Sequence, residues 1–175
     1  MKRLFIFVFS IIFLAGCIPH RRVYNALHEA TITSGQVLIQ VYLRVYDFAE
    51  SADGVDVLCA DLLKKHKDEI EAGTYTEEQL KADCTEIIYD FERKFDKALT
   101  VAADSLETLE SSLEVYKQAT DKDAQFKKIV DCLSEAIKAL NNIVTLLKDC
   151  DVPVPQKLID YIRSLEGIAN SVEAA

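Results

Sequence analysis

The chain has 175 residues, which is enough for one domain with a real hydrophobic core. Its 29 acidic residues outnumber its 20 basic ones, and the formal net charge of −9 argues against a nucleic acid as partner, because phosphate binding needs a basic face. With only 5 glycines, 3 prolines and no tryptophan, the composition favours long helices over a sheet with many turns.

The first residues have the order of an export signal. Lys2 and Arg3 precede an apolar run over residues 4–13, and a short Leu-Ala-Gly segment then leads into Cys17. The apolar run is 10 residues long, whereas a membrane-spanning helix needs about 20. The segment therefore predicts export rather than a membrane helix.

Residues 14–17, Leu-Ala-Gly-Cys, resemble the lipobox of bacterial lipoproteins. The resemblance implies cleavage just before Cys17 and a diacylglycerol on its thiol. Residues 1–16 are then a cleaved signal peptide, 17–22 the lipidated cysteine with a short tether, and 23–175 an acidic helical domain. An ordinary signal peptide with a chance cysteine is the alternative. The resemblance covers the leader alone and implies nothing about the domain behind it.

The acyl chains would hold the domain close to the bilayer. Two or more chains anchor a protein firmly, and the tether over 18–22 extends to only about 17 Å. In Gram-negative lipoproteins a residue other than Asp after the lipidated cysteine, here Ile18, implies the outer membrane, facing the periplasm. Loss of the two basic residues in the leader would leave 18 basic against 29 acidic residues, a net charge of −11.

Between residues 22 and 50, apolar residues recur at helical spacing. Within 37–46 they also alternate with other residues, and that alternation is typical of a strand. A strand needs a pairing partner, and no other segment has a clear strand pattern, so we predict a helix. Residues 51–54, Ser-Ala-Asp-Gly, form a break signal. The helix is expected to resume at Val55 and to run to about Glu71.

The clearest helix start is a capping box with Thr76 as N-cap and Gln79 reaching back. From Leu80 to Tyr116, apolar residues three or four apart predict a helix of about 40 residues, roughly 60 Å long. After a turn near 120–123, the same spacing predicts a third long helix.

The third helix carries its apolar residues between Phe126 and Leu147 and ends at the prolines of 151–155. A short last helix follows Pro155, with inward residues Leu158, Ile162, Leu165 and Ile168. Short loops favour antiparallel neighbours. The predicted fold is an all-α, up-down antiparallel bundle of three long helices, the first broken near Gly54, plus a short C-terminal helix.

An even set of cysteines remains beside Cys17, and in an oxidising compartment it indicates disulfides: Cys59, Cys84, Cys132 and Cys150. The first two lie on either side of one loop, at similar depth, and could bridge. The last two are 18 residues apart on one helix, about 27 Å, which is too far for a bridge. A break near Asn141 or pairing across helices would be needed, and four buried free thiols are the alternative.

Carboxylates and tyrosines are the candidate contact residues. A row of carboxylates on one side of the long helix is suited to a basic partner or, weakly, a divalent cation, although solvated helix faces have the same pattern: Asp104, Glu107, Glu110 and Glu114. Calcium sites usually also take loop oxygens, so no metal site is predicted. Tyr24, Tyr42 and Tyr46 could form an aromatic contact surface or pack with their hydroxyls in water.

No hydrolase, phosphate-loop, zinc, haem or di-iron motif is present, so neither an enzyme nor a cofactor is predicted. We predict a lipid-anchored envelope protein that binds another envelope or exported protein as scaffold, blocker or sensor. The alternative is a carrier of a small apolar ligand in a cavity lined by Val41, Phe91 and Phe95. An enzyme would need a cleft holding His28 or His66 beside a perturbed acid or a free thiol.

Overall fold

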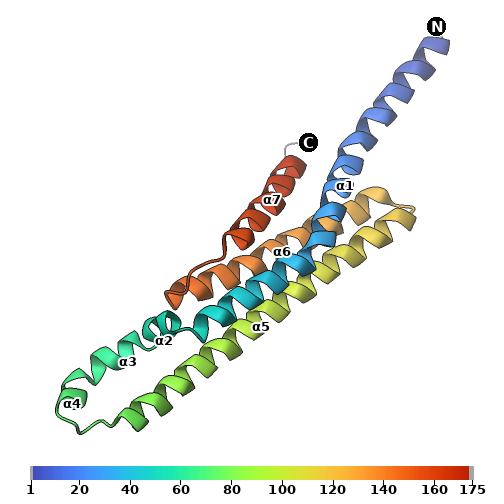
Figure 1. Ribbon diagram of the computed structural model, residues 1–175. Helices are drawn as coiled ribbons and strands as arrows, with labels where there is room; N and C mark the ends of the chain where they lie inside the picture. Colours follow the sequence, from blue (N-terminus) through green and yellow to red (C-terminus); the bar gives the residue numbers. More distant parts are fainter. Residues whose placement is uncertain (1, 174–175) are drawn as a thin grey trace.

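The computed structural model describes the backbone of residues 2–173 and the side chains of residues 21–171. The described backbone forms seven helices and no strand (Figure 1). The bundle consists of α1 (Lys2–Ala49), α5 (Glu77–Gln118), α6 (Lys122–Asp149) and the shorter α7 (Gln156–Glu173). The predicted all-α antiparallel bundle of three long helices and a short C-terminal helix is confirmed.

Three short helices form an arm that continues the line of α1 along the first half of α5 (Figure 1). They are α2 (Ala52–Leu58), α3 (Ala60–Lys65) and α4 (Lys67–Glu71). The arm lies at the end of the bundle opposite to the N-terminal part of α1, which projects beyond the other helices (Figure 1). We call the arm end distal.

The four bundle helices close a ring around the core. Helix α1 packs against α5 and α7, and α6 packs against the same two helices, so α1 and α6 stand diagonally opposite each other. Each buried Leu, Ile or Phe contributes about 1.5–3 kcal/mol. All four helices supply the largest fully buried side chains: Leu27, Val41, Phe95, Leu109, Leu113, Ile129, Leu133, Leu140, Ile143, Leu147, Leu158 and Leu165.

Helix α1 settles the ambiguity at residues 37–46. That segment is helical throughout, and Val41 and Val45 lie in the core, so the strand alternative is wrong. Residues 17–22 also lie within α1. The side chain of Cys17 lies outside the described residues, as do the side chains of the leader, residues 1–16. Among the residues that were searched, no helix is both long and apolar enough to cross a membrane.

The break after α1 comes slightly earlier than predicted. Helix α1 ends at Ala49, and Ser51 caps α2 by accepting a hydrogen bond from the N–H of Gly54 at 3.1 Å. Gly54 therefore lies inside the first turn of α2. A Cβ at this position would lie 1.8 Å from the carbonyl oxygen of Phe48, so the glycine permits a close approach between the two helices rather than ending one.

The predicted single helix from Val55 to Glu71 is wrong in its continuity, because the chain is interrupted at Cys59 and His66. Both interruptions occur where another part of the arm or of α5 holds the side chain. Cys59 is bonded to Cys84 of α5, and the ring of His66 stacks on Tyr75 with 4.3 Å between centroids.

The remaining helix ends follow the predicted signals. The capping box is present, with Gln79 N–H donating to Thr76 Oγ1 at 3.2 Å and Thr76 N–H donating to Gln79 Oε1 at 2.8 Å. Asp121 caps α6 by accepting from the N–H of Ala124 at 2.9 Å. Helix α6 is continuous to Asp149, so it does not break near its paired asparagines.

Candidate functional site

One disulfide fastens the arm to the bundle. Cys59 and Cys84 are bonded, with 5.7 Å between their Cα atoms, as their positions on either side of the loop predicted. Cys132 and Cys150 are free and half-buried. Because α6 is continuous between them, the rise per residue keeps them about 27 Å apart, which explains why they do not pair.

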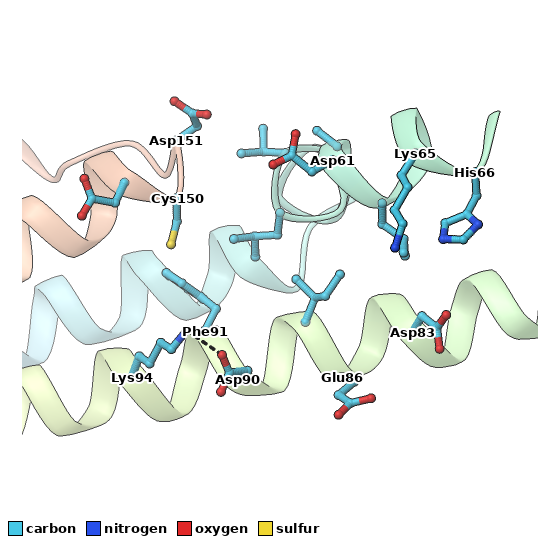
Figure 2. Close-up of a pocket in the computed structure, with 16 residues that line it drawn as sticks. Asp61, Lys65, His66, Asp83, Glu86, Asp90, Phe91, Lys94, Cys150 and Asp151 are labelled. Carbon is cyan, nitrogen blue, oxygen red and sulfur yellow. Dashed lines mark ion pairs between the residues drawn. The ribbon is translucent and has the colours of Figure 1, made fainter.

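A groove of about 620 Å³ lies at the distal end, and we call it the distal groove (Figure 2). The arm, α5 and the end of α6 form its walls. Its apolar floor includes Leu58, Ile87 and Phe91, and its rim carries several carboxylates together with Lys65 and Lys94. A groove with charged groups around an apolar floor is a place where catalytic groups could lie.

Some charged groups of the distal groove are held in ion pairs. Asp90 accepts from Lys94 at 2.7 Å and from Arg93 at 2.6 Å, and these bonds lower its pKa. The same bond to Asp90 raises the pKa of Lys94. At the other end, His66 contacts Glu69 at 2.5 Å. These pairs are solvent-exposed and their members satisfy one another, so none of these paired groups is poised as an acid or a base.

The free thiol in the groove has the wrong properties for a nucleophile. Cys150 points toward Phe91 and Lys94, whereas His66 lies at the opposite end of the groove (Figure 2). Burial raises the pKa of the Cys150 thiol, and the thiolate is the reactive form. The described residues also contain no cluster of His, Cys, Asp or Glu that could hold a metal ion.

The second histidine lies at the end of the bundle opposite to the arm. His28 stacks on Tyr24 with 5.9 Å between ring centroids, and Tyr24 in turn stacks on Tyr116 at 5.7 Å. These rings pack α1 against α5. Tyr24 is thus part of the packing and not of an exposed aromatic surface.

A second surface is more unusual: α1 is apolar on two opposite sides. One side enters the core, as expected for a bundle helix. On the other side Ile32, Ile39 and Leu43 are 64%, 61% and 51% exposed. They are seven and four residues apart, so they share one line along the helix, and we call them the outer stripe. Because α1 is diagonal to α6, this line points away from the bundle.

Beside the outer stripe, α1 and α5 enclose a shallow apolar groove of about 230 Å³, the α1–α5 groove. Its walls are Leu38, Ile39 and Tyr42 from α1 and Leu99, Thr100 and Ala103 from α5. It is mostly apolar because Thr100 donates its hydroxyl to a carbonyl of its own helix at 2.9 Å. The groove therefore offers apolar side chains and almost no free hydrogen-bonding group.

The predicted tyrosine pair closes the distal end of this groove. Tyr42 and Tyr46 have 4.5 Å between ring centroids, which confirms that they cluster. Tyr46 donates its hydroxyl to Asp96 at 3.0 Å and packs on Phe95. Burial, together with the bond to Asp96, raises the pKa of Tyr46. The pair is held in place, and Tyr42 remains partly exposed toward the groove.

The predicted carboxylate row continues the groove along α5. Its four members are exposed: Asp104, Glu107, Glu110 and Glu114. Glu107, Glu110 and Glu114 follow Ala103 by four, seven and eleven residues, so they share its face of the helix. The interleaved Ser105 and Thr108 donate their hydroxyls to carbonyls of the same helix. The acidic row thus starts at the apolar groove and runs toward the end of α5.

The residues expected to line a cavity in the carrier alternative are packed against other side chains in the core. Val41 and Phe95 are fully buried and Phe91 nearly so, and all three belong to one packed cluster. Side chains fill the space between the helices that they were expected to line. The fold therefore favours a role for the surface over a role for the interior.

Sequence reasoning missed the outer stripe, although a signal was present. The apolar alternation at 37–46 arises because Val41 and Val45 enter the core while Ile39 and Leu43 point outward. A helix with apolar residues on both faces mimics the period of a strand.

Comparison with known proteins gives no match among family models, curated proteins or solved structures.

Proposed function

We propose that this chain is a lipid-anchored protein of the bacterial cell envelope that acts by binding another envelope or exported protein. It is a scaffold, blocker or sensor at the membrane surface and not a catalyst. The observation that carries the proposal is the outer stripe beside the α1–α5 groove. Contiguous exposed apolar residues on a small soluble domain mark an interaction surface.

The energetics support this use of the stripe. Burying a whole Leu or Ile side chain is worth about 1.5–3 kcal/mol, so covering the exposed parts of Ile39 and Leu43 would gain about 1–2 kcal/mol each. No fold constraint requires apolar residues there, because the core of the bundle is built by the other side of α1. Tyr42, an aromatic anchor between the stripe and the groove, is of the type enriched at binding hot spots.

The anchor rests on the lipobox-like segment before Cys17. Acyl chains on that thiol would fix the start of α1 at the bilayer. Ile32 follows Cys17 by 15 residues and Leu43 by 26, or about 22 and 39 Å along a helix. The outer stripe would then stand in the layer just above the head groups, within reach of other envelope proteins.

A photo-reactive amino acid placed at Leu43 of the full chain in its native envelope tests the proposal. We expect a specific protein adduct from this position. The matched control is Asn142, an exposed residue on α6, diagonal to α1, from which the adduct should be absent. No adduct from Leu43, or the same adduct from both positions, contradicts a role for this surface.

Mass spectrometry of the N-terminal peptide tests the anchor separately. The expected product starts at Cys17 and carries acyl chains. An unmodified Cys17, or a leader still attached in a soluble fraction, contradicts the anchoring.

A further inference from the structure

We propose that the α1–α5 groove and the acidic row together bind a cationic amphipathic helix of the partner protein. The inference rests on the proposed function and goes beyond it by assigning the partner's docking element. The helix would place its apolar side chains in the groove and its Lys or Arg side chains on the acidic row.

The α1–α5 groove and the acidic row form one continuous surface. Ala103 lies in the groove, and Glu107 and Glu110 follow on the same face of α5 within two helical turns. An apolar floor that passes directly into a line of carboxylates matches a helix with an apolar stripe bordered by basic residues. In helix-in-groove recognition of this kind, apolar side chains at positions i, i+3 or i+4, and i+7 of the bound helix enter the groove.

Few basic residues of the chain lie close enough to neutralise the negative charge of the acidic row. Helix α5 carries no Lys or Arg between Lys97 and Lys117, although it carries four carboxylates there. The facing part of α1, residues 23–43, contains no Lys or Arg either. Glu114 pairs with Lys117 at 2.6 Å, but within residues 21–171 neither Glu107 nor Glu110 has an ion-pair partner.

A cationic helix fits this surface better than a second copy of the chain or a lipid surface does. A second copy of this chain, anchored in the same bilayer, would bring its own acidic row to the same height, and like charges would oppose the pairing. An anionic lipid surface would be repelled in the same way. A cationic helix gains from both parts of the surface, because it buries apolar area and meets unpaired carboxylates.

The test uses the full-length lipidated protein in nanodiscs of zwitterionic phosphatidylcholine, with empty nanodiscs as background. The probe is a fluorescent amphipathic helix of Leu and Lys, about four turns long. The matched probe replaces every Lys by Glu. We expect saturable binding of the Leu/Lys helix that weakens with salt, and at least tenfold weaker binding of the Leu/Glu helix. Equal binding of the two probes, or no binding of the Leu/Lys helix above background, overturns the proposal.

Charge reversal locates the site. We expect Glu107→Lys with Glu110→Lys to weaken binding of the Leu/Lys probe about tenfold. The matched control reverses two exposed acids on other helices, Asp131→Lys with Glu166→Lys, and should change binding less than about threefold, since screening limits remote charges. Equal losses in the two double variants would mean general attraction to an acidic protein, which overturns the site.

Apolar variants test the groove half of the surface. Ile39→Ser should weaken binding of the Leu/Lys probe about fivefold, since the side chain loses its contact with the apolar stripe of the probe. Val115→Ser is the control, because Val115 is similarly exposed on α5 outside the groove, and it should have no effect. Equal effects of both variants contradict groove docking. If the probe fails to bind while Leu43 still gives its specific adduct in the envelope, the partner chemistry is wrong and the proposed function stands.

Discussion

The close contact at Gly54 gives the sharpest test of the fold. In Gly54→Ala the new Cβ would lie 1.8 Å from the carbonyl oxygen of Phe48 and 2.7 Å from its carbon. Non-bonded heavy atoms pack best at about 3.5–4 Å, so α2 or the end of α1 must move by about 1.5 Å or more. The carbonyl cannot yield easily, because it accepts from both the N–H of Ser51 at 3.0 Å and its hydroxyl at 2.6 Å.

The cost can be assembled from two contributions. Overpacking a well-packed site costs about 1–3 kcal/mol. Movement of α2 also breaks the hydrogen bond by which Ser51 caps it, worth about 1 kcal/mol. We therefore expect Gly54→Ala to lower the free energy of unfolding by about 2–4 kcal/mol. For a chain of this size the melting temperature should fall by about 5–15 °C.

Gly167→Ala is the matched control, because Gly167 is also helical and a Cβ there meets nothing within 4 Å. Alanine is the better helix former by about 0.8–1 kcal/mol, so this variant should be slightly more stable than the natural chain. Urea denaturation followed by far-UV circular dichroism measures both. If Gly54→Ala unfolds at the same urea concentration as the natural chain, the contact between α1 and α2 is not as close as described.

Three other predictions concern the cross-link, the end of α6 and a buried tyrosine hydroxyl. Reducing the bond between Cys59 and Cys84, which closes a loop of 25 residues, should lower the free energy of unfolding by about 3 kcal/mol; urea midpoints with and without reductant measure it, and an unchanged midpoint would contradict the link. Asp151→Gly should raise the free energy of unfolding by up to about 1 kcal/mol, and the melting temperature by a few degrees, because this residue has a φ of 55° at the end of α6. A lower melting temperature would mean that the carboxylate of Asp151 stabilises the folded chain. Burial raises the pKa of Tyr161 from 10.0 to about 12, and its hydroxyl donates to the carbonyl of Ala30 at 3.1 Å. The folded chain therefore holds this proton more tightly than the unfolded chain, so the stabilisation is complete below pH 10 and is lost as the pH rises from 10 to 12. As the pH rises between those values, the urea midpoint should fall more steeply for the natural chain than for Tyr161→Phe. An equal fall in both would contradict the raised pKa of Tyr161.

The long helices were predictable because their signals are local. The apolar spacing of α5 and α6 repeats for many turns, and the capping box at Thr76 needs only residues within one turn of it. The disulfide followed from the same information, since a loop between two antiparallel helices brings Cys59 and Cys84 to one level.

The arm could not be predicted in detail because its breaks depend on distant residues. Nothing next to His66 in sequence ends a helix, and the ring is held by stacking on Tyr75, nine residues later. The α1–α5 groove has the same origin. Its walls come from two helices, and the bond between Tyr46 and Asp96 marks the register in which those helices pack, which is a property of the whole bundle.

The outer stripe explains why the sequence around residue 40 is ambiguous. A bundle helix with one buried face would carry polar residues at 39 and 43, and its apolar period would then be helical without question. Ile39 and Leu43 break that pattern at a cost in solubility, and the core gains nothing from them. Local features that conflict with the global fold are expected at functional sites. The strand-like pattern and the outer stripe are thus one feature, observed first in the sequence and then on the helix.

The proposed anchor gives this feature a position that suits a cationic partner. If Cys17 carries lipid, Glu114 and Glu110 lie nearer to the bilayer than the α1–α5 groove does, because α5 runs antiparallel to α1. Cationic helices collect at anionic membrane surfaces, gaining about 1 kcal/mol per Lys or Arg close to the head groups. The acidic row would compete with those head groups for the same positive charges, and the α1–α5 groove would offer the apolar face of the helix an alternative to the head-group/acyl boundary. A partner helix would therefore leave the membrane surface for this protein only if the groove and the acidic row together bind it more tightly than the interface does. A helix that is both apolar and basic, as the Leu/Lys probe is, contacts both parts of this surface.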